Sequence, residues 1–567
     1  MHLTASALCT DCTRIRLRLM ARSQLQKSLS FTRREPFLLN LAKKCLDSEF
    51  RQYIRSQGYT LRIFRLVDDA YKNPSLALMT SYVFYVLSRA KIGIAIDEHT
   101  LYLIIQLMKS QPPSPTDPTH KDYMKYRKNI WSTLQEWQNA WKTTLAEAGQ
   151  SGASLQCDVT EDNLSASFLV TESLVWISAH RNEQWFKKGI RNFGGLEFMV
   201  AQVAAIVDDI PSKRSSWVPQ SAEHLKLLER YLRIIESVTL LNDENRAFLI
   251  THKESSLLKR CATLLRVCHD VIIDLSTKPT CSDDVVLAKF IRTTKLVIRV
   301  LCNLSHNNEL CCERLGALDG FLRTCMACIS HIARVCVPAH ERFDLLVLLL
   351  GFVCNIVEHS NTNRHRLIGI TLPWTDYEQQ ATTGAGKGRT NKPMKLPAMA
   401  VLAKMFVLHD VAARRMDEEV DEEIDLDRVG TPSPSDSGDE DDDSGDDGQT
   451  TGDARRPTAK DRKQQKEQKP MSEQDIAHAL QSIMGKAGAH MEDCMSASYI
   501  ALLIGCVLQQ NEDAFDTVRE HIPDGDMKPM LAQLKQFHEF MEMTNKVGDS
   551  SLESITKVID LLKTFDE

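Results

Sequence analysis

Five short polar turns that contain asparagine recur along this 567-residue chain, each between two apolar segments. The marker residues Asn182, Asn245, Asn308 and Asn363 follow one another at intervals of 63, 63 and 55 residues, and Asn511 comes 148 residues later. A repeated interval is typical of proteins in which similar structural units stack one on the next. The turns therefore favour an array of related units over one globular core.

The segments between these turns have helical periodicity and are apolar on nearly every side, most clearly at residues 297–304 and 345–357. A helix without a polar face has to be buried between neighbours, and stacked helix pairs provide that burial. Glycine and proline make up 43 of the 567 residues, which is low for a turn-rich β protein. We predict an all-α HEAT/armadillo-like solenoid in which strand alternation is nowhere convincing. A non-repetitive helical globule is the alternative.

Charge and composition divide the chain further. Residues 417–447 hold sixteen acidic residues against one arginine, whereas residues 455–469 are rich in lysine and arginine. Such charged runs are typical of disordered segments. We predict a poorly ordered segment at 1–35, helical repeats of an N-terminal lobe and a middle at 36–370, a loop and helix at 371–414, a disordered acidic then basic insert at 415–472, and C-terminal helical repeats at 473–567.

The predicted insert also carries signals of regulation. Thr431 and Ser433 each precede a proline, and Ser435 and Ser437 lie among acidic residues, so phosphorylation at these four positions is a hypothesis. The basic stretch at 455–469 resembles a nuclear import signal. A solvated linker with balancing charge explains the same composition.

Several functions are disfavoured by what the sequence contains. No apolar run approaches the roughly 20 residues that span a bilayer, which argues against a membrane protein. Cys325, Cys328 and His331 have metal-ligand spacing, but the segment around them is apolar and helical, so buried structural cysteines are favoured over zinc. The glycine-rich loop at 384–388 lacks the Ser or Thr of a phosphate-binding loop. We expect no enzyme, no cofactor and no small-molecule substrate.

Ordered blocks of residues from about position 38 onward resemble the C-terminal domain of the wings apart-like cohesin release factors. The blocks are LSR at 87–89, LYLII at 101–105, WFK at 185–187, GGL at 194–196, LSHNNE at 304–309, ERFD at 341–344, NIVEHS at 355–360 and HMEDC at 490–494. Residues 1–35 contain no Phe-Gly-Phe motif, with which animal members of the family tether partners. Recruitment through that motif is therefore not carried over to this chain.

The resemblance implies a HEAT-repeat domain without catalytic activity that binds cohesin and promotes its release from chromatin, and so controls sister chromatid cohesion. The implied partners are the accessory, kleisin and ATPase subunits of cohesin and a HEAT-repeat cohesin regulator, with chromatin contacted indirectly. The implied location is the nucleus. From the residues alone, an armadillo-like peptide-binding adaptor in nuclear transport or signalling remains the alternative.

Two groups of residues are candidates for partner binding. Met491 and Met495 lie four residues apart, so they share a helix face, and they match family positions implicated in release. Core packing is the alternative for this pair. Lys187, Lys188 and Arg191 form a basic group suited to an acidic partner, with an ordinary solvated helix face as the alternative.

Overall fold

The computed structural model confirms an all-α fold. It describes residues 31–88, 94–147, 159–211, 219–277, 283–375, 394–429, 473–511, 513–544 and 549–565, most of them in helices. The chain divides into two compact units, residues 1–398 and 399–567.

The first unit consists of a run of helices, with one short hairpin at its end. In order they are α2 (Phe31–Lys44), α3 (Ser48–Ser56), α4 (Tyr59–Leu66), η2 (Ala70–Lys72), α5 (Pro74–Ser88), α6 (Glu98–Met108), α7 (His120–Glu147), α8 (Ala166–Ala179), α9 (Gln184–Asn192), α10 (Gly195–Asp209), α11 (Pro219–Thr239), α12 (Asp243–Thr251), α13 (Ser256–Thr277), α14 (Asp283–Ser305), α15 (Glu309–Gly316), α16 (Phe321–Ala327), the π-helix η4 (Cys328–Cys336), α17 (Ala339–Glu358) and α18 (Asn361–Ile368).

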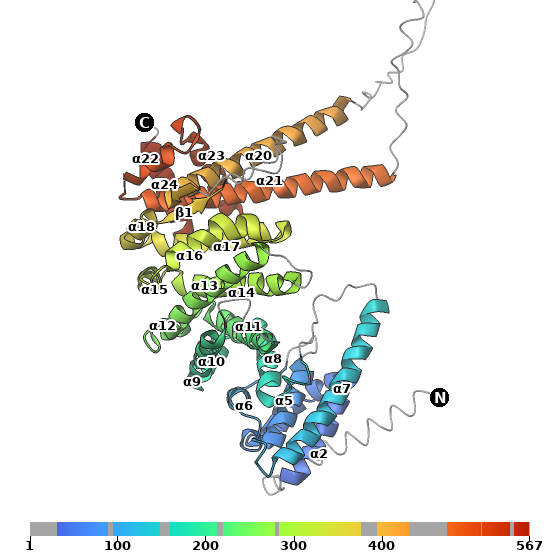
Figure 1. Ribbon diagram of the computed structural model, residues 1–567. Coiled ribbons are helices and arrows are strands. Elements are labelled where there is room, and N and C mark those ends of the chain that lie inside the picture. The colour runs from blue at the N-terminus through green and yellow to red at the C-terminus, as the bar shows by residue number, and fades with distance from the viewer. Residues whose placement is uncertain are drawn as a thin grey trace, which may run out of the picture. The chain divides into compact units, whose positions relative to one another are not determined.

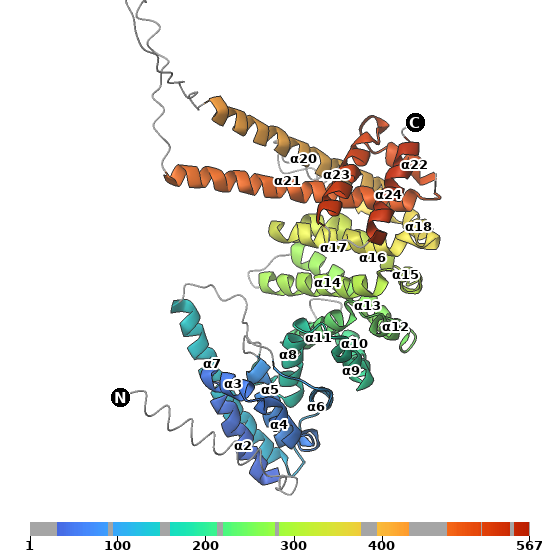
Figure 2. The same cartoon turned by 180° about the vertical axis from the view of Figure 1, so that it is seen from behind.

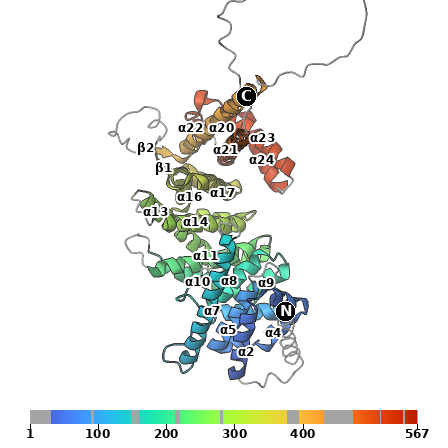
Figure 3. The ribbon, with the colours of Figure 1, turned by 90° about the vertical axis from the view of Figure 1, so that its right-hand side faces the viewer.

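Each repeat in the middle of this unit has three helices rather than the predicted pair. A long helix is followed by a helix of eight or nine residues and then by another helix, as in α8–α9–α10, α11–α12–α13 and α14–α15–α16. The first helices pack in the order α8, α11, α14, α17, and the third helices α10 and α13 pack on each other. Figures 1 and 3 show this stacking of α11, α14 and α17. HEAT/armadillo-like repeats contain two or three helices, so this arrangement agrees with the predicted solenoid.

The most apolar helices occupy the centre of the packing, as their composition requires. Every residue of α5 from Ser75 to Ser88 is buried, because α2, α7 and α8 cover it. The predicted segment at 345–357 lies in α17, and most of its side chains are buried. These helices have no polar face, so contact of any side with water is unfavourable. Neighbouring helices therefore have to cover them.

Three of the five predicted turns cap the short helix that follows them, whereas Glu183, the residue directly before α9, makes no capping hydrogen bond through its side chain. The side chains of Asn242, Asn308 and Ser360 accept hydrogen bonds from the backbone N–H groups of Asn245, Cys311 and Asn363 at the starts of α12, α15 and α18. Such a cap satisfies one of the amides that a helix start leaves unpaired. These three turns are thus encoded locally by the capping residue.

Two buried asparagines tie successive repeats together. The Asn245 side chain donates one hydrogen bond to the carbonyl of Val238 in its own repeat and one to the carbonyl of Lys187 in the preceding repeat, both at 3.0 Å. Asn363 does the same with Ile356 at 3.2 Å and Cys312 at 2.9 Å. Both side chains are fully buried, so each bond replaces one that water would otherwise make.

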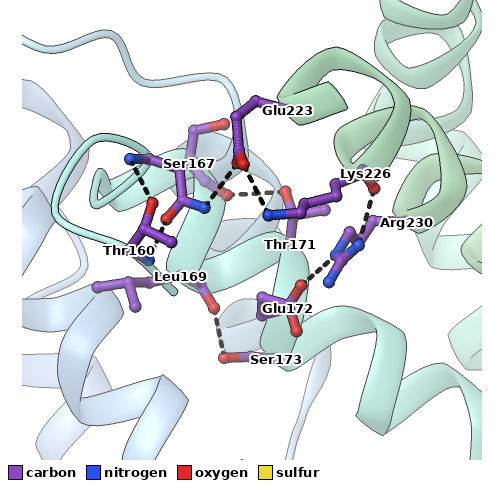
Figure 4. Close-up of polar contacts among 10 residues, drawn as sticks. Thr160, Ser167, Leu169, Thr171, Glu172, Ser173, Glu223, Lys226 and Arg230 are labelled. Atoms are coloured by element: carbon purple, nitrogen blue, oxygen red, sulfur yellow. Dashed lines mark hydrogen bonds and ion pairs between the residues drawn. The ribbon is translucent and has the colours of Figure 1, made fainter. Parts of the chain in front are cut away.

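A buried ion pair joins α8 to α11, as Figure 4 shows. The guanidinium Nε of Arg230 donates to the carboxylate of Glu172, and both side chains are almost completely shielded from water. Within α11 itself, the partly exposed Lys226 donates to Glu223 at 2.6 Å. Because each buried charge has a partner, removal of either one would leave the other uncompensated.

The structure corrects three sequence predictions about order and strands. Residues Thr371–Trp374 (β1) and Met394–Pro397 (β2) form an antiparallel hairpin, which the sequence pattern did not indicate. Helix α2 begins at Phe31, inside the segment predicted to be poorly ordered. Helix α20 continues to Val429, which lies within the predicted disordered insert, and residues 430–472 lie outside the described residues.

The second unit is helical throughout its described residues. It contains α20 (Ala398–Val429), α21 (Glu473–Leu508), α22 (Asp513–Arg519), η5 (Pro523–Gly525), α23 (Lys528–Thr544) and α24 (Asp549–Thr564). Figure 2 shows α20 and α21 as its two long helices. Helices α23 and α24 pack on the C-terminal half of α21 and on each other, and Gly505 of α21 allows the close approach of Val558.

One stretch of α21 departs from the expectation that no segment is long and apolar enough to span a membrane. Residues Gly485–Leu508 meet that test by length and composition, with a mean hydropathy of 1.5. Within the structure, 61% of the tested window is buried against the rest of the protein. A core helix passes the same test, and Ala497, Ile500 and Leu503 are core residues of this unit. The composition of α21 therefore does not distinguish a membrane-spanning helix from a buried core helix.

The close contact between α15 and α18 gives a test of the joints between repeats. A Cβ atom at Gly316 would lie 1.9 Å from the side-chain oxygen of Asn363. We expect Gly316→Ala to displace Asn363, to break its bonds to the two carbonyls and to lower the free energy of unfolding by about 2–4 kcal/mol. Urea unfolding and hydrogen exchange in α15 and α18 measure the effect.

Gly369→Ala is the matched control, because a Cβ there meets its nearest neighbours at 3.6 Å, an ordinary contact. We expect this variant to unfold within about 1 kcal/mol of the wild type. Equal stability of the two variants would contradict the role given to Asn363.

Candidate functional site

The candidate face of α21 comes from the part of the helix that emerges from the core of the second unit. Met491 is 55% exposed, and Met495, one turn further along, is half-buried. The next turns are core, since Ala497 and Ile500 are fully buried. Met491 is therefore a surface residue rather than a core residue, and Met495 lies at the boundary.

Polar side chains surround this methionine pair. The Cys494 thiol lies 3.3 Å from Nε2 of His490, one turn earlier on α21. The neighbouring Asp493 carboxylate is 2.7 Å from Nδ1 of His409, which is on α20. The second contact fixes this part of α21 against α20.

The base of this face is rigid. The ring of Tyr499 on α21 lies 5.1 Å from the ring of Phe537 on α23, and the Ser498 hydroxyl donates to the Cys494 carbonyl at 2.8 Å. Methionine side chains are flexible and polarisable, so an exposed methionine can adapt to different partner surfaces. A flexible side chain on a fixed helix is an arrangement suited to binding a protein partner.

Three other apolar side chains of this unit are exposed and were not selected from the sequence. They are Val411 on α20, and Phe540 and Met543 on α23, of which Met543 is 79% exposed. The signal was available on α23, where Met530, Leu534 and Phe537 form the buried stripe and Phe540 and Met543 fall outside it. Exposed large apolar residues outside a core stripe are candidates for contact with other proteins.

The basic candidates on α9 do not form one exposed group. Lys187 is only 2% exposed, and its ammonium donates to the carbonyl of Leu240 at 2.6 Å, just past the end of α11. Lys188 is exposed. Arg191 binds the carboxylate of Glu244 and the side-chain oxygen of Asn245. The prediction that all three face a partner is therefore wrong for Lys187, which joins two repeats instead.

The chemistry of Lys187 follows from its burial. Its ammonium is placed where the carbonyls at the end of α11 carry partial negative charge, which favours a cation. Loss of water nevertheless dominates and lowers the pKa of Lys187 from its ordinary value. No carboxylate within the described residues forms an ion pair with Lys187.

The cysteines with metal-ligand spacing are core residues. Cys325 and Cys328 are buried in α16 and η4, and burial raises the pKa of both thiols, which keeps them protonated. Burial also lowers the pKa of His331. Among the described residues, no three His, Cys, Asp or Glu side chains are arranged to hold a metal ion. The predicted phosphorylation positions Thr431, Ser433, Ser435 and Ser437 lie outside the described residues.

Comparisons with known proteins give a consistent result. A family model described as wings apart-like protein regulation of heterochromatin matches residues 22–363. Wings apart-like protein homolog 1 of Caenorhabditis elegans is 32% identical over 537 residues, which cover 93% of this chain and 66% of that protein.

Two further relatives carry the same description. The human wings apart-like protein homolog is 29% identical over 541 residues, covering 93% of this chain and 43% of that protein. The Drosophila melanogaster protein wings apart-like is 23% identical over 544 residues, covering 93% and 28%. The chain thus spans less than half the length of the human and fly relatives and 66% of the nematode one.

Buried Lys187 gives a pH-dependent prediction. Because its pKa is lowered in the folded chain, the unfolded chain binds this proton more readily, and the wild type gains stability as pH rises toward the ordinary lysine pKa of about 10.4. Lys187→Met has no such proton to bind. We therefore expect urea unfolding between pH 7.5 and 10 to show the wild type gaining stability relative to Lys187→Met as pH rises.

Lys188→Met, at the exposed neighbouring position, is the control and is expected to track the wild type at every pH. A constant difference between the wild type and Lys187→Met across this range would show that the ammonium is not penalised by burial.

Proposed function

Since this chain belongs to the wings apart-like family, we propose that it binds cohesin, promotes the release of cohesin from chromatin and thereby controls sister chromatid cohesion. The observation that carries the proposal is the family match over residues 22–363, together with relatives aligned over 93% of the chain. The architecture supports it, because stacked helical repeats offer long surfaces for protein partners. The chain is a wings apart-like regulator.

Release by a protein of this kind is a binding event rather than a catalysed reaction. A ligand shifts an equilibrium between two states only by binding one of them more tightly. The chain would therefore bind cohesin with its ring open more tightly than cohesin with its ring closed. ATP hydrolysis would belong to the ATPase subunits of cohesin.

The partners and the location follow from the same proposal. Cohesin's accessory, kleisin and ATPase subunits and a HEAT-repeat cohesin regulator are the proposed partners, and the nucleus is the proposed location. The family description names regulation of heterochromatin, which is consistent with action on chromatin. Within the second unit, Met491 and Met495 on α21 are the proposed contact, because Met491 is exposed on a helix whose following turns are fixed in the core.

We expect Met491→Lys/Met495→Lys to reduce binding to purified cohesin at least tenfold, because two charges would have to lose water at the contact. Surface immobilisation of the full chain and titration with cohesin measure this loss. Circular dichroism confirms that the variant is folded.

Met124→Lys is the matched control, since Met124 on α7 of the first unit is also exposed and apolar. Unchanged binding by the double variant would move the contact away from α21. Absence of cohesin binding by the wild type itself would overturn the proposed function of this chain.

A further inference from the structure

Among the described cysteines, Cys494 is one of two that are not fully buried, and its thiol has a histidine side chain as a partner. It is only half-buried, and its Sγ lies 3.3 Å from Nε2 of His490. The two side chains are four residues apart on α21, so they lie on the same face of the helix. An imidazole at this distance can take the thiol proton and leave a thiolate beside an imidazolium, which is how cysteine nucleophiles are commonly activated.

The other described cysteines are in environments that suppress reaction. Ten of the twelve are buried. Burial raises the pKa of Cys261 and Cys268 to about 12. Cys302 reaches the surface in part, yet burial raises its pKa to about 12 as well. Thiols that stay protonated at neutral pH are poor nucleophiles, because the thiolate is the reactive form.

We propose that Cys494 is a site of reversible oxidation by hydroperoxides, with His490 as the base that activates it. The Cys494 thiolate attacks one oxygen of the peroxide, the S–O bond forms as the O–O bond breaks, and the leaving hydroxide takes the proton from the His490 imidazolium to become water. Sulfur loses two electrons and becomes sulfenic acid, while the peroxide is reduced. A small-molecule thiol then condenses with the sulfenic acid to form a mixed disulfide and water, and a second molecule of that thiol displaces Cys494, which regenerates its thiol and leaves the two small thiols joined as a disulfide.

The position of Cys494 gives the modification a consequence. It directly precedes Met495 and lies three residues after Met491, so a polar and bulkier sulfur would be introduced beside the proposed cohesin contact. Asp493, between these residues, binds His409 of α20, so a shift of this turn would also reach α20. This consequence rests on the proposed function, whereas the reactivity of the thiol does not.

Reactivity is tested on the full chain with iodoacetamide at pH 7, and the labelled residue is identified by mass spectrometry. We expect Cys494 to react at least tenfold faster than Cys302 and Cys506 in the same molecule.

His490→Gln should slow the reaction of Cys494 at least fivefold, because the amide cannot take the proton, and leave the reaction of Cys302 unaffected. Equal rates at Cys494 in the wild type and in His490→Gln would overturn the role of His490, and a rate at Cys494 no higher than at Cys302 would overturn the site.

Oxidation is tested separately, with hydrogen peroxide followed by dimedone, which traps sulfenic acids. We expect dimedone on Cys494. In the cohesin titration, we expect the peroxide-treated chain that has not been trapped to bind more weakly, and dithiothreitol to restore its binding. Dithiothreitol does not reduce methionine sulfoxide, so restoration excludes oxidation of Met491 or Met495 as the cause. Cys494→Ser should lose the part of the response that dithiothreitol reverses.

The two proposals fail in different ways. Dimedone labelling with no change in cohesin binding would keep the oxidation site and remove its regulatory consequence. Cohesin binding without dimedone on Cys494 would keep the proposed function and overturn the oxidation site.

Discussion

The repeat architecture of the first unit depends on buried asparagine side chains that bond to the carbonyls of adjacent repeats. Asn245 and Asn363 are fully buried, and each donates to one carbonyl of its own repeat and one of the repeat before it. A buried carbonyl without a donor costs free energy of about 1–3 kcal/mol, so these side chains set how closely adjacent repeats approach. Gly316 completes the joint at Asn363, because only a residue without a side chain fits there.

Charged side chains serve the same joints. Lys187 donates to the carbonyl of Leu240 at the end of α11, and Arg230 pairs with Glu172 between α8 and α11. Buried charges are costly unless they are paired or hydrogen-bonded, so each of them requires its neighbouring repeat to be in place. Lys187 and Arg230 therefore contribute to the stacking of repeats, whereas Lys188 stays exposed.

The function proposed for the second unit depends on the change in environment along α21. The part that contains Ala497 and Ile500 is held in the core, whereas Met491 is exposed only a few residues earlier. The same change brings Cys494 to the surface next to His490, while most other described cysteines stay buried. The proposed binding surface and the proposed oxidation site thus both lie where one helix leaves its core.

Features that are encoded within a few residues can be read directly from the sequence. The helical periodicity, the asparagine turns before α12 and α15 and the central position of the most apolar segments depend on local hydrogen bonds and on side-chain polarity, so they follow from the sequence. The family resemblance, which the comparisons confirm, likewise rests on residues read in order. The exposure of Met491 does not follow from the sequence, because the apolar pattern of α21 is equally consistent with a core position.

Which side chains are buried depends on the packing of segments that are far apart in the chain. The short second helix in each repeat, the hairpin of β1 and β2, the burial of Lys187 and the exposure of Phe540 depend on which distant helices pack together. A lysine on a helix looks solvent-facing in the sequence, and α11 lies more than thirty residues further along the chain from Lys187. Burial is a property of pairs of segments, so a pattern within one segment cannot specify it.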